Sequence, residues 1–217
     1  MKALITGASR GLGRALAREL VAAGWEVIAD ARDGAALAEA LPRAFTIAGD
    51  ITDPWHRAAL AEAAGGVLDL LVNNAGTLGA APLPALADYP PDELRAAFEA
   101  NVIAPLALTQ LLLPALRTAG GAVLNITSDA AVEPYPGWGG YGATKAALEQ
   151  ASAVLAAEEP AIRVWRADPG DLRTDMHQAA FPGADISDRP LPETAAPGFM
   201  KLIGERPPSG RYQIGDL

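Results

Sequence analysis

Short apolar runs alternate with longer helical patterns along this chain, and that alternation is what most restricts its fold. Strand-length apolar runs fall at residues 2–6, 26–30, 44–48, 67–73, 121–127, 162–167 and 211–215. The stretches between them predict helices at residues 12–23, 34–41, 54–64, 92–118, 141–159 and 193–204. Strands that alternate with helices build parallel sheets covered on both faces. We therefore expect an α/β fold with a doubly wound, parallel, seven-stranded sheet in three layers.

The length and composition predict one domain. The chain has 217 residues, half of them apolar, which is enough for one sizeable core spanning residues 1–217. The only long loop that the sequence predicts lies at about residues 178–192. Cysteine is absent, and the two histidines, His56 and His177, are far apart in the sequence. We expect neither disulfides nor a metal site.

Charge and hydropathy restrict the partners and the compartment. The net charge is −9 and the basic residues form no stripe, which argues against nucleic acid or an anionic membrane as the partner. Neither a signal peptide nor an uninterrupted apolar run of about 20 residues is evident. We expect a soluble, cytoplasmic protein that acts on a small molecule.

A glycine-rich segment follows the first predicted strand and opens the first predicted helix. Gly7 would permit a tight turn, Gly11 would let the backbone approach a pyrophosphate, and Gly13 would allow close helix packing. The spacing Gly-x-x-x-Gly-x-Gly differs from the common Gly-x-Gly-x-x-Gly fingerprint. Taken alone, the segment could also be an ordinary glycine-rich turn.

Tyr141 and Lys145 form the second feature that suggests chemistry. Four residues apart on a predicted helix, they share one face, where the ammonium would favour the phenolate. A phenol with a lowered pKa can exchange a proton near neutral pH. Such pairs also occur by chance, but this chain has only three lysines against 14 arginines, so a lysine at this position is unusual here. Together with the glycine segment, the pair indicates hydride transfer with a nicotinamide.

Several motifs together resemble the short-chain dehydrogenase/reductase family over residues 1 to about 176. They are the segment from Thr6 to Gly13, Asn73-Asn74-Ala75-Gly76, Asn101, Ser128, Tyr141, Lys145, and Pro169-Gly170 through Thr174. The intervals of 27 residues from Asn101 to Ser128 and 13 from Ser128 to Tyr141 agree with the family pattern. The resemblance implies a Rossmann-like fold and NAD(P)-dependent oxidation or reduction.

The resemblance also implies a role for each catalytic residue. Tyr141 would be the general acid in carbonyl reduction, and Lys145 would bind the nicotinamide ribose and lower the tyrosine pKa. Ser128 would hydrogen-bond the substrate oxygen, and Asn101 would hold a water in a proton relay. Ser128 could instead be only a loop-start residue.

The same resemblance assigns the cofactor contacts. They are Gly7, Ser9, Arg10, Gly11, Leu12, Gly13, Arg32, Asp50, Ile51, Asn73, Ala75, Gly76, Tyr141, Lys145, Pro169, Gly170 and Thr174. Asn73, Ala75 and Gly76 would lie along the nicotinamide-side ribose, whereas Asn74 would tie neighbouring strands together. Asp50 could alternatively be a loop or cap residue. Asn125, in a predicted strand, is expected to make a structural hydrogen bond.

Residues 30–32 favour NADP over NAD. An acidic side chain about 20 residues past the glycines usually reads a free 2′-hydroxyl, and an arginine reads a 2′-phosphate. The position that discriminates is Ala31, followed by Arg32, and Arg10 is a second candidate for the phosphate. Asp30 falls one residue early and should point to the opposite face. A one-residue slip would reverse this choice.

The C-terminal part departs from the usual family pattern. Only 47 residues follow Gly170, so the segment that covers the substrate, about residues 175–195, must be short. Trp138, Met176 and Phe181 fall where family members line the substrate pocket, which suggests an apolar site. Trp138 could also serve ordinary packing, and a solvent-exposed loop position is expected for His177. The last predicted strand resembles that of shorter, C-factor-like members.

We therefore expect an oxidoreductase that transfers a hydride between NADP(H) and a carbonyl compound or secondary alcohol. The alternative is an NADP-binding redox sensor or regulatory protein with little turnover. Such proteins commonly lose the catalytic tyrosine or lysine, and both are present here. The Ala- and Leu-rich helices at 92–118 and 141–159 correspond to the family's subunit contacts, so we expect a homodimer or homotetramer.

Overall fold

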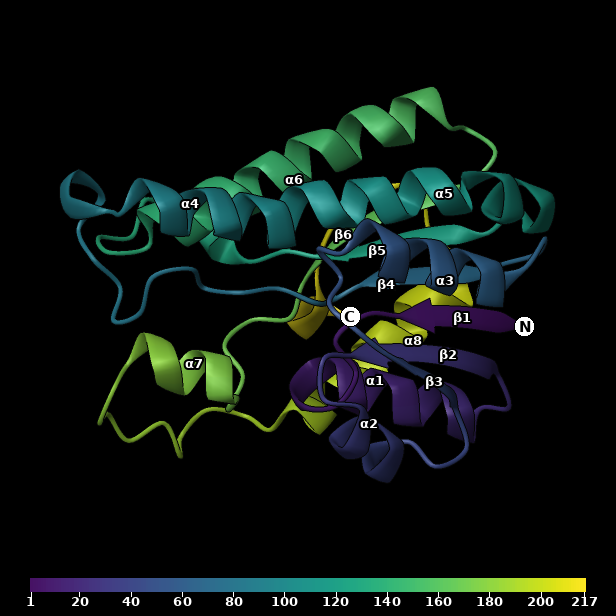
Figure 1. The fold of residues 1–217 in the computed structure, drawn as a ribbon, viewed down its shortest axis with the longest axis horizontal. Helices are drawn as coiled ribbons and strands as arrows, with labels where there is room; N and C mark the ends of the chain where they lie inside the picture. Colours follow the sequence, from purple (N-terminus) through teal and green to yellow (C-terminus); the bar gives the residue numbers. More distant parts are fainter.

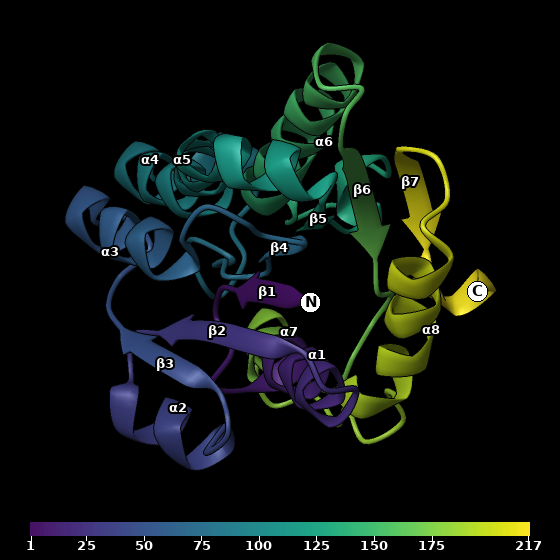
Figure 2. The same ribbon diagram turned by 90° about the vertical axis from the view of Figure 1, so that its right-hand side faces the viewer.

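The computed structural model describes residues 1–217 and is built around one parallel sheet (Figures 1 and 2). Its strands are β1 (Lys2–Ile5), β2 (Glu26–Ala31), β3 (Phe45–Ala48), β4 (Leu70–Asn73), β5 (Ala122–Ile126), β6 (Arg163–Asp168) and β7 (Gly210–Gln213). The strand order is β3-β2-β1-β4-β5-β6-β7, and every pair is parallel. The expected seven-stranded α/β fold is confirmed.

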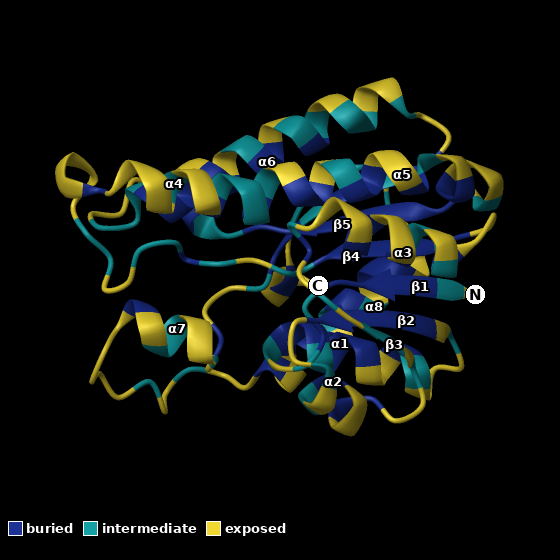
Figure 3. Cartoon of the chain, viewed as in Figure 1, coloured by how far each residue is buried: buried dark blue, intermediate teal, exposed yellow.

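Helices cover both faces of the sheet. They are α1 (Gly11–Ala22), α2 (Gly34–Ala40), α3 (Pro54–Ala64), α4 (Pro91–Phe98), α5 (Ala104–Ala119), α6 (Gly139–Glu158), α7 (Asp175–Ala180) and α8 (Pro192–Glu205). On one face α1, α2 and α8 bury Leu16, Leu37 and Phe199 against the strands. On the other face α3 and α5 bury Leu60 and Leu108. Strands β4 and β5 are wholly buried in the middle of the sheet, whereas the edge strands β3 and β7 are partly exposed (Figure 3).

Two predicted elements differ from the structure. The helix expected at residues 92–118 is α4 and α5 joined by a π-helical turn at Glu99–Ile103. Such turns widen a helix locally and are frequent at functional sites, but no periodicity marks them in a sequence. The structure also places α7 where only a covering segment and a loop were expected. Thr174 caps this short helix by accepting a hydrogen bond from the His177 backbone N–H at 3.1 Å.

The helical stretch Pro91–Ala119 is long and apolar enough to cross a membrane by length and composition. In this fold, however, its α5 part is a helix of the core. Ala104, Leu108 and Leu112 are buried with residues of β4 and β5. The apolar character of α5 therefore has a packing explanation.

The sheet order brings the predicted functional residues to one edge. The chain passes from β1 to β2 and β3 on one side and then returns to β4 on the other side of β1. Ligands of doubly wound sheets bind at the carboxyl ends of the strands beside such a reversal. Thr6, Asn74 and Ser128 follow β1, β4 and β5 at that edge.

The different burial of two phenylalanines predicts that truncating them has unequal effects on the free energy of unfolding. Phe199 in α8 is fully buried, whereas the Phe45 residue in β3 is 61% exposed. Phe199→Ala should lower the free energy of unfolding by about 3–5 kcal/mol, because it leaves a cavity. The matched Phe45→Ala change should lower it by less than about 1 kcal/mol. Urea unfolding measures both, and equal losses would contradict the packing described for α8.

Candidate active site

The loop after β1 is fastened to the end of β4. The Thr6 hydroxyl oxygen accepts hydrogen bonds from the backbone N–H groups of Asn74 and Ala75, each at 3.0 Å. In return, the Asn74 side-chain amide donates to the carbonyl oxygens of Thr6 at 2.8 Å and Gly7 at 3.1 Å. The prediction that Asn74 ties neighbouring strands is thereby confirmed.

The glycines of this loop allow close backbone contacts, and Gly7 and Gly13 leave no room for a side chain. Gly7 has a positive φ of 68°, and a Cβ there would lie 2.9 Å from the Ala75 Cα. A Cβ on Gly13 would lie 2.4 Å from the Gly7 carbonyl oxygen, so this glycine is needed for close packing. Gly11 has a φ of 56°, and the nearest atom to its Cβ would be the Thr174 methyl group at 3.6 Å.

The loop has the properties of an anion site. Helix α1 begins at Gly11, and no side chain caps its amino end at Arg10. Its first backbone N–H groups therefore have no partner within the helix, and the helix dipole favours negative charge there. A pyrophosphate fits this combination of open backbone and helix amino end.

The Asp30 side chain interacts with other residues inside the protein. Its carboxylate accepts a hydrogen bond from the Gly7 backbone N–H at 2.8 Å and lies 3.0 Å from Nε2 of His56. Its carbonyl oxygen also accepts from the Ala8 N–H at 2.8 Å. Asp30 and His56 are both buried, so this pair supports the glycine loop from below. Ala31, the last residue of β2, therefore remains as the position that could discriminate between cofactors.

Two arginines lie near the region where the adenosine end of a dinucleotide would bind. Arg32 follows β2, and its positive charge helps to lower the pKa of Asp50, after the larger effects of hydrogen bonds from the Thr52 backbone and hydroxyl. Arg10 forms an exposed ion pair with Asp175 at 3.0 Å. The Asp50 carboxylate caps the turn after β3, in agreement with the alternative prediction of a loop or cap residue. Ile51 beside it is buried.

The Asn73 side chain points into the protein. Its amide donates to the Thr109 hydroxyl at 3.2 Å and to Asn125 Oδ1 at 2.8 Å. Asn125 in turn donates to Ser152 at 2.7 Å, which confirms its expected structural role. Any contact of Asn73 with a ribose would therefore come from its backbone. Ala75 and Gly76 continue along the same edge.

Tyr141 and Lys145 lie on one face of α6, as their spacing predicted, and both are buried. The Lys145 ammonium donates to the Ile126 carbonyl oxygen at 2.8 Å and lies 5.6 Å from the centre of the Tyr141 ring. Burial lowers the pKa of Lys145 to about 8.

The electrostatics of Tyr141 differ from the sequence-based expectation. Burial raises the pKa of its phenol well above the usual value, and the charges of Asp168 and Asp129 raise it further. The Ser128 side chain acts in the opposite direction and lowers the Tyr141 pKa. The expected lowering by Lys145 is not seen in the free protein, where desolvation of the phenolate is the largest cause of the shift and Lys145 is not among the causes.

Ser128 and Asn101 complete the predicted set of four residues. Ser128 follows β5; its hydroxyl donates to Asp129 Oδ1 at 2.9 Å and accepts from the Ala130 N–H at 3.2 Å. Ser128 is thus a loop-start cap as well as a neighbour of Tyr141. Asn101 lies in the π-helical turn and is buried. Its side chain accepts from the Thr77 N–H at 2.8 Å and donates to the Thr77 carbonyl at 2.8 Å.

Trp138 connects Tyr141 to a small group of aromatic side chains. The Trp138 ring meets the Tyr141 ring edge-on at 5.7 Å, and Phe181 lies 6.0 Å from Trp138. His177 packs on Phe181 at 5.0 Å with only 9% of its side chain exposed, so the expected solvent-exposed position for His177 is wrong. Met176 is 37% exposed at the start of α7 and takes no part in this aromatic group.

The loop after β6 lies at the same edge of the sheet as the glycine loop. Gly170 has a φ of 71°, and its N–H donates to Asp168 Oδ1 at 3.0 Å. Pro169 precedes it, and Thr174 lies over Gly11 of the glycine loop. These predicted cofactor residues are therefore brought to the same edge as the glycines.

Sequence reasoning missed a buried charged group behind the site. Asp168, at the end of β6, and Glu149, in α6, are both ion-paired with Arg211 of β7. No local signal marks this group in the sequence, because its members come from α6, β6 and β7, which lie far apart along the chain.

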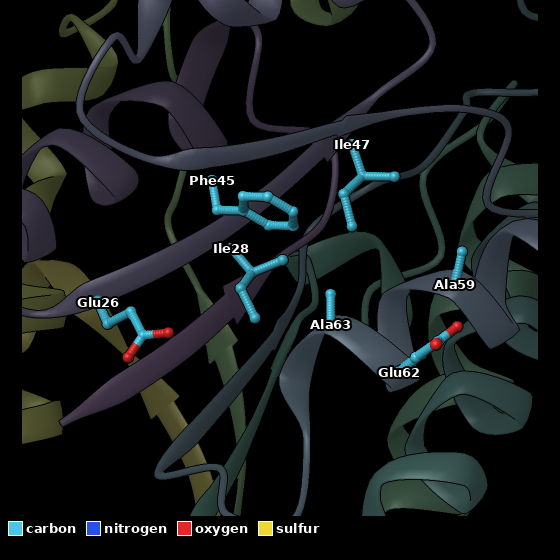
Figure 4. Close-up of a pocket in the computed structure, with 7 residues that line it drawn as sticks. All are labelled: Glu26, Ile28, Phe45, Ile47, Ala59, Glu62 and Ala63. Carbon is cyan, nitrogen blue, oxygen red and sulfur yellow. The ribbon is translucent and has the colours of Figure 1, made fainter.

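A hollow of about 590 Å³ lies elsewhere in the molecule. Figure 4 shows it between β2, β3 and α3, where Ile28, Phe45 and Ile47 form its apolar wall. Glu26 and Glu62 are the charged residues around it. None of the predicted catalytic or cofactor residues lines this hollow.

Known proteins share both the sequence and the fold. The family model for short chain dehydrogenases matches residues 1–185. Serine 3-dehydrogenase of Agrobacterium fabrum is 42% identical over 185 residues, covering 80% of this chain and 72% of the relative. Sepiapterin reductase of Meriones unguiculatus is 36% identical over 199 residues, covering 82% and 76%. A Shigella flexneri short chain dehydrogenase solved in complex with NADP is 28% identical, with a TM-score of 0.89 over 99% of this chain and 96% of its own.

The glycine loop, the Ser128, Tyr141 and Lys145 side chains and these similarities lead to one conclusion: the chain belongs to the short-chain dehydrogenase/reductase family of NAD(P)-dependent oxidoreductases.

Proposed function

We propose that this protein is an NADP-dependent reductase of small or medium-sized carbonyl compounds that also oxidises the corresponding secondary alcohols. The observation that carries the proposal is the meeting of Ser128, Tyr141 and Lys145 beside the glycine loop. The Tyr141 ring lies 5.6 Å from the Lys145 ammonium, and the Ser128 side chain is near enough to the phenol to lower its pKa. A phenol, a hydroxyl and an ammonium at one point are the groups that protonation of a carbonyl oxygen needs.

The residues present fit a dinucleotide. The backbone of Gly7, Ser9, Gly11, Leu12 and Gly13 would hold the pyrophosphate at the α1 amino end. Asp50 and Ile51 would flank the adenine, and the backbone of Asn73, Ala75 and Gly76 would line the ribose, with Pro169, Gly170 and Thr174 on the opposite side. When bound, the nicotinamide would supply or accept the hydride.

Tyr141 would donate its proton to the carbonyl oxygen during reduction. Because burial and the nearby carboxylates keep the phenol protonated, the free protein holds the acid in the form that reduction requires. Ser128 would hydrogen-bond the same oxygen, for which its hydroxyl must turn away from Asp129. Lys145 would bind the ribose hydroxyls from below. Since the Asn101 side chain is occupied by Thr77 and Thr144, its backbone carbonyl is the group left to hold a relay water.

The end of β2 supports the preference for NADP. The Asp30 carboxylate is committed to Gly7 and His56, so it does not serve as the acid that reads a free 2′-hydroxyl. Ala31 offers no charge, and Arg32 follows it; Arg10 would be a second partner if its pair with Asp175 opened. The NADP complex of the Shigella relative is in line with this preference.

The covering segment at residues 175–195 supports a compact, apolar substrate. Trp138 and Phe181 place aromatic surface beside Tyr141, with Met176 at the rim. The names of the relatives point to quite different substrates, serine and sepiapterin, so we propose only the chemical class.

Exposed apolar residues on α5 and α6 support a homodimer or homotetramer. Leu111 is 50% exposed and Val154 is 44% exposed, and Leu106 is 38% exposed near the start of α5. A second subunit would remove these side chains from water. We place the protein in the cytoplasm, where NADPH and small carbonyl compounds are available.

The proton donor gives the first test. Tyr141→Phe should keep NADPH binding but lower turnover of a carbonyl substrate by at least about 100-fold, because the acid is lost. Absorbance decay at 340 nm across a panel of aldehydes and ketones measures turnover. Tyr212→Phe is the matched control: its hydroxyl binds the Pro208 carbonyl away from the site, and it should retain activity. Substantial turnover by Tyr141→Phe would overturn the mechanism.

Arg32 gives a test of cofactor choice. Arg32→Ala should weaken NADPH binding by about 10-fold or more while leaving NADH binding nearly unchanged, because only NADPH has the 2′-phosphate. Fluorescence titration with each nucleotide measures both affinities. Arg95→Ala, which removes an exposed arginine on α4, should change neither. Equal weakening of NADPH and NADH would show that Arg32 does not meet the phosphate.

The lowered pKa of Lys145 predicts a pH dependence of cofactor binding. Lys145 is protonated below about pH 8 and can donate to the ribose there. NADPH affinity should be steady below that pH and weaken as the pH rises through it, by at most about tenfold per unit. Lys145→Met should bind more weakly with a flat profile above pH 8. Parallel profiles for the two proteins would assign the pH dependence to another group.

A further inference from the structure

We propose that Arg211, on the last strand, is a positioning residue for the catalytic tyrosine, and that it acts by neutralising Asp168 behind Tyr141. This inference rests on the proposed proton transfer by Tyr141. It concerns a residue that lies outside the four-residue catalytic set and near the end of the chain. Three contacts and the charges around the phenol lead to it.

Arg211 joins four elements behind the site. Its Nε donates to Glu149 Oε1 in α6 at 2.8 Å, and its Nη2 donates to Asp168 Oδ2 at the end of β6 at 3.0 Å. The same Nη2 approaches the Ser128 carbonyl oxygen, after β5, at 3.4 Å. One guanidinium on β7 therefore contacts the backbone of one catalytic residue and two acidic side chains.

The two acids depend on Arg211 to different degrees. Glu149 is also approached by Arg166, at 3.9 Å, and accepts a hydrogen bond from the Thr127 hydroxyl at 2.8 Å. Asp168 has Arg211 as its only ion-pair partner, and its side chain is 5% exposed. Burial raises the pKa of Asp168, whereas the Gly170 N–H and the charge of Arg211 lower it.

Asp168 is the more effective of two acids that act on Tyr141. The charges concerned are Lys145, 5.6 Å from the ring on the same helix, and the carboxylates of Asp168 in β6 and Asp129 after β5, which both raise the Tyr141 pKa. Asp168 has the larger effect of the two carboxylates on the Tyr141 pKa. Charges interact strongly in a buried region, so an unpaired Asp168 would oppose formation of the phenolate more than the paired one does.

A purely structural role is the competing explanation, because the same contacts tie β7 to the sheet. The two explanations differ in one measurable quantity, the pH at which Tyr141 ionises. A structural tie affects stability and leaves that pH unchanged. Neutralisation of Asp168 changes it, and in a direction that the partner mutation reverses.

The test is a titration of Tyr141 that needs no substrate. The protein is saturated with oxidised NADP, or with NAD if that binds better, because the positive nicotinamide should bring the phenol into an accessible pH range. Tyrosinate absorbance at 295 nm is followed between about pH 6 and pH 11, and the trace of Tyr141→Phe is subtracted. This readout distinguishes failure of the inference from failure of the proposed carbonyl reduction, since the phenol titrates whether or not a substrate is known.

Arg211→Met should move the Tyr141 midpoint upward by about one pH unit. Arg211→Lys, which keeps the charge, should stay near the wild-type midpoint, and the double change Arg211→Met with Asp168→Asn should return to it or fall below it. If Arg211→Met does not fold, Asp168→Asn alone still decides, because it should lower the midpoint.

Glu149→Gln is the matched control, since it loses an Arg211 contact but leaves Asp168 paired, and should keep the wild-type midpoint. Unchanged midpoints in Arg211→Met and Asp168→Asn would overturn the inference and leave a structural tie.

Discussion

The reciprocal hydrogen bonding between the glycine loop and the end of β4 is the interaction on which the site depends. Thr6 accepts from the backbone that follows β4, and Asn74 donates back to the loop carbonyls. These bonds hold the turn in a shape that only Gly7 and Gly13 can adopt without steric overlap. The open amino end of α1 is thereby fixed beside the strands that bear the other functional residues, so the anion site is built before any ligand arrives.

The charges around Tyr141 set the chemistry that this geometry can perform. A buried phenol beside two carboxylates stays protonated in the free protein, which suits a proton donor. The positive charges nearby are Lys145, whose ammonium donates to the Ile126 carbonyl, and Arg211, which is paired with Asp168. The state of the phenol is thus decided by several elements of the fold together, whereas no single neighbour controls it.

Much of the fold could be predicted from the sequence because its signals are local. Apolar runs marked the strands, and the glycine spacing placed the start of α1. The π-helical turn at Glu99–Ile103 escaped, because helical periodicity continues through it. Among the site residues, spacing on α6 brought Tyr141 and Lys145 together as expected. The inward direction of Asn73, the raised pKa of Tyr141 and the Arg211 network depend on contacts between distant segments, and one sequence does not reveal those.

The burial of Asp30 has a consequence for protein engineering. Asp30 is the acidic residue one position before Ala31, where the residue that discriminates between the cofactors was expected. In the structure the Asp30 carboxylate interacts with both Gly7 and His56. Replacing Asp30 would therefore disturb the glycine loop and weaken the binding of NAD and NADP alike. A variant meant to change the proposed preference for NADP toward NAD should therefore introduce the acid at Ala31 and keep Asp30 intact.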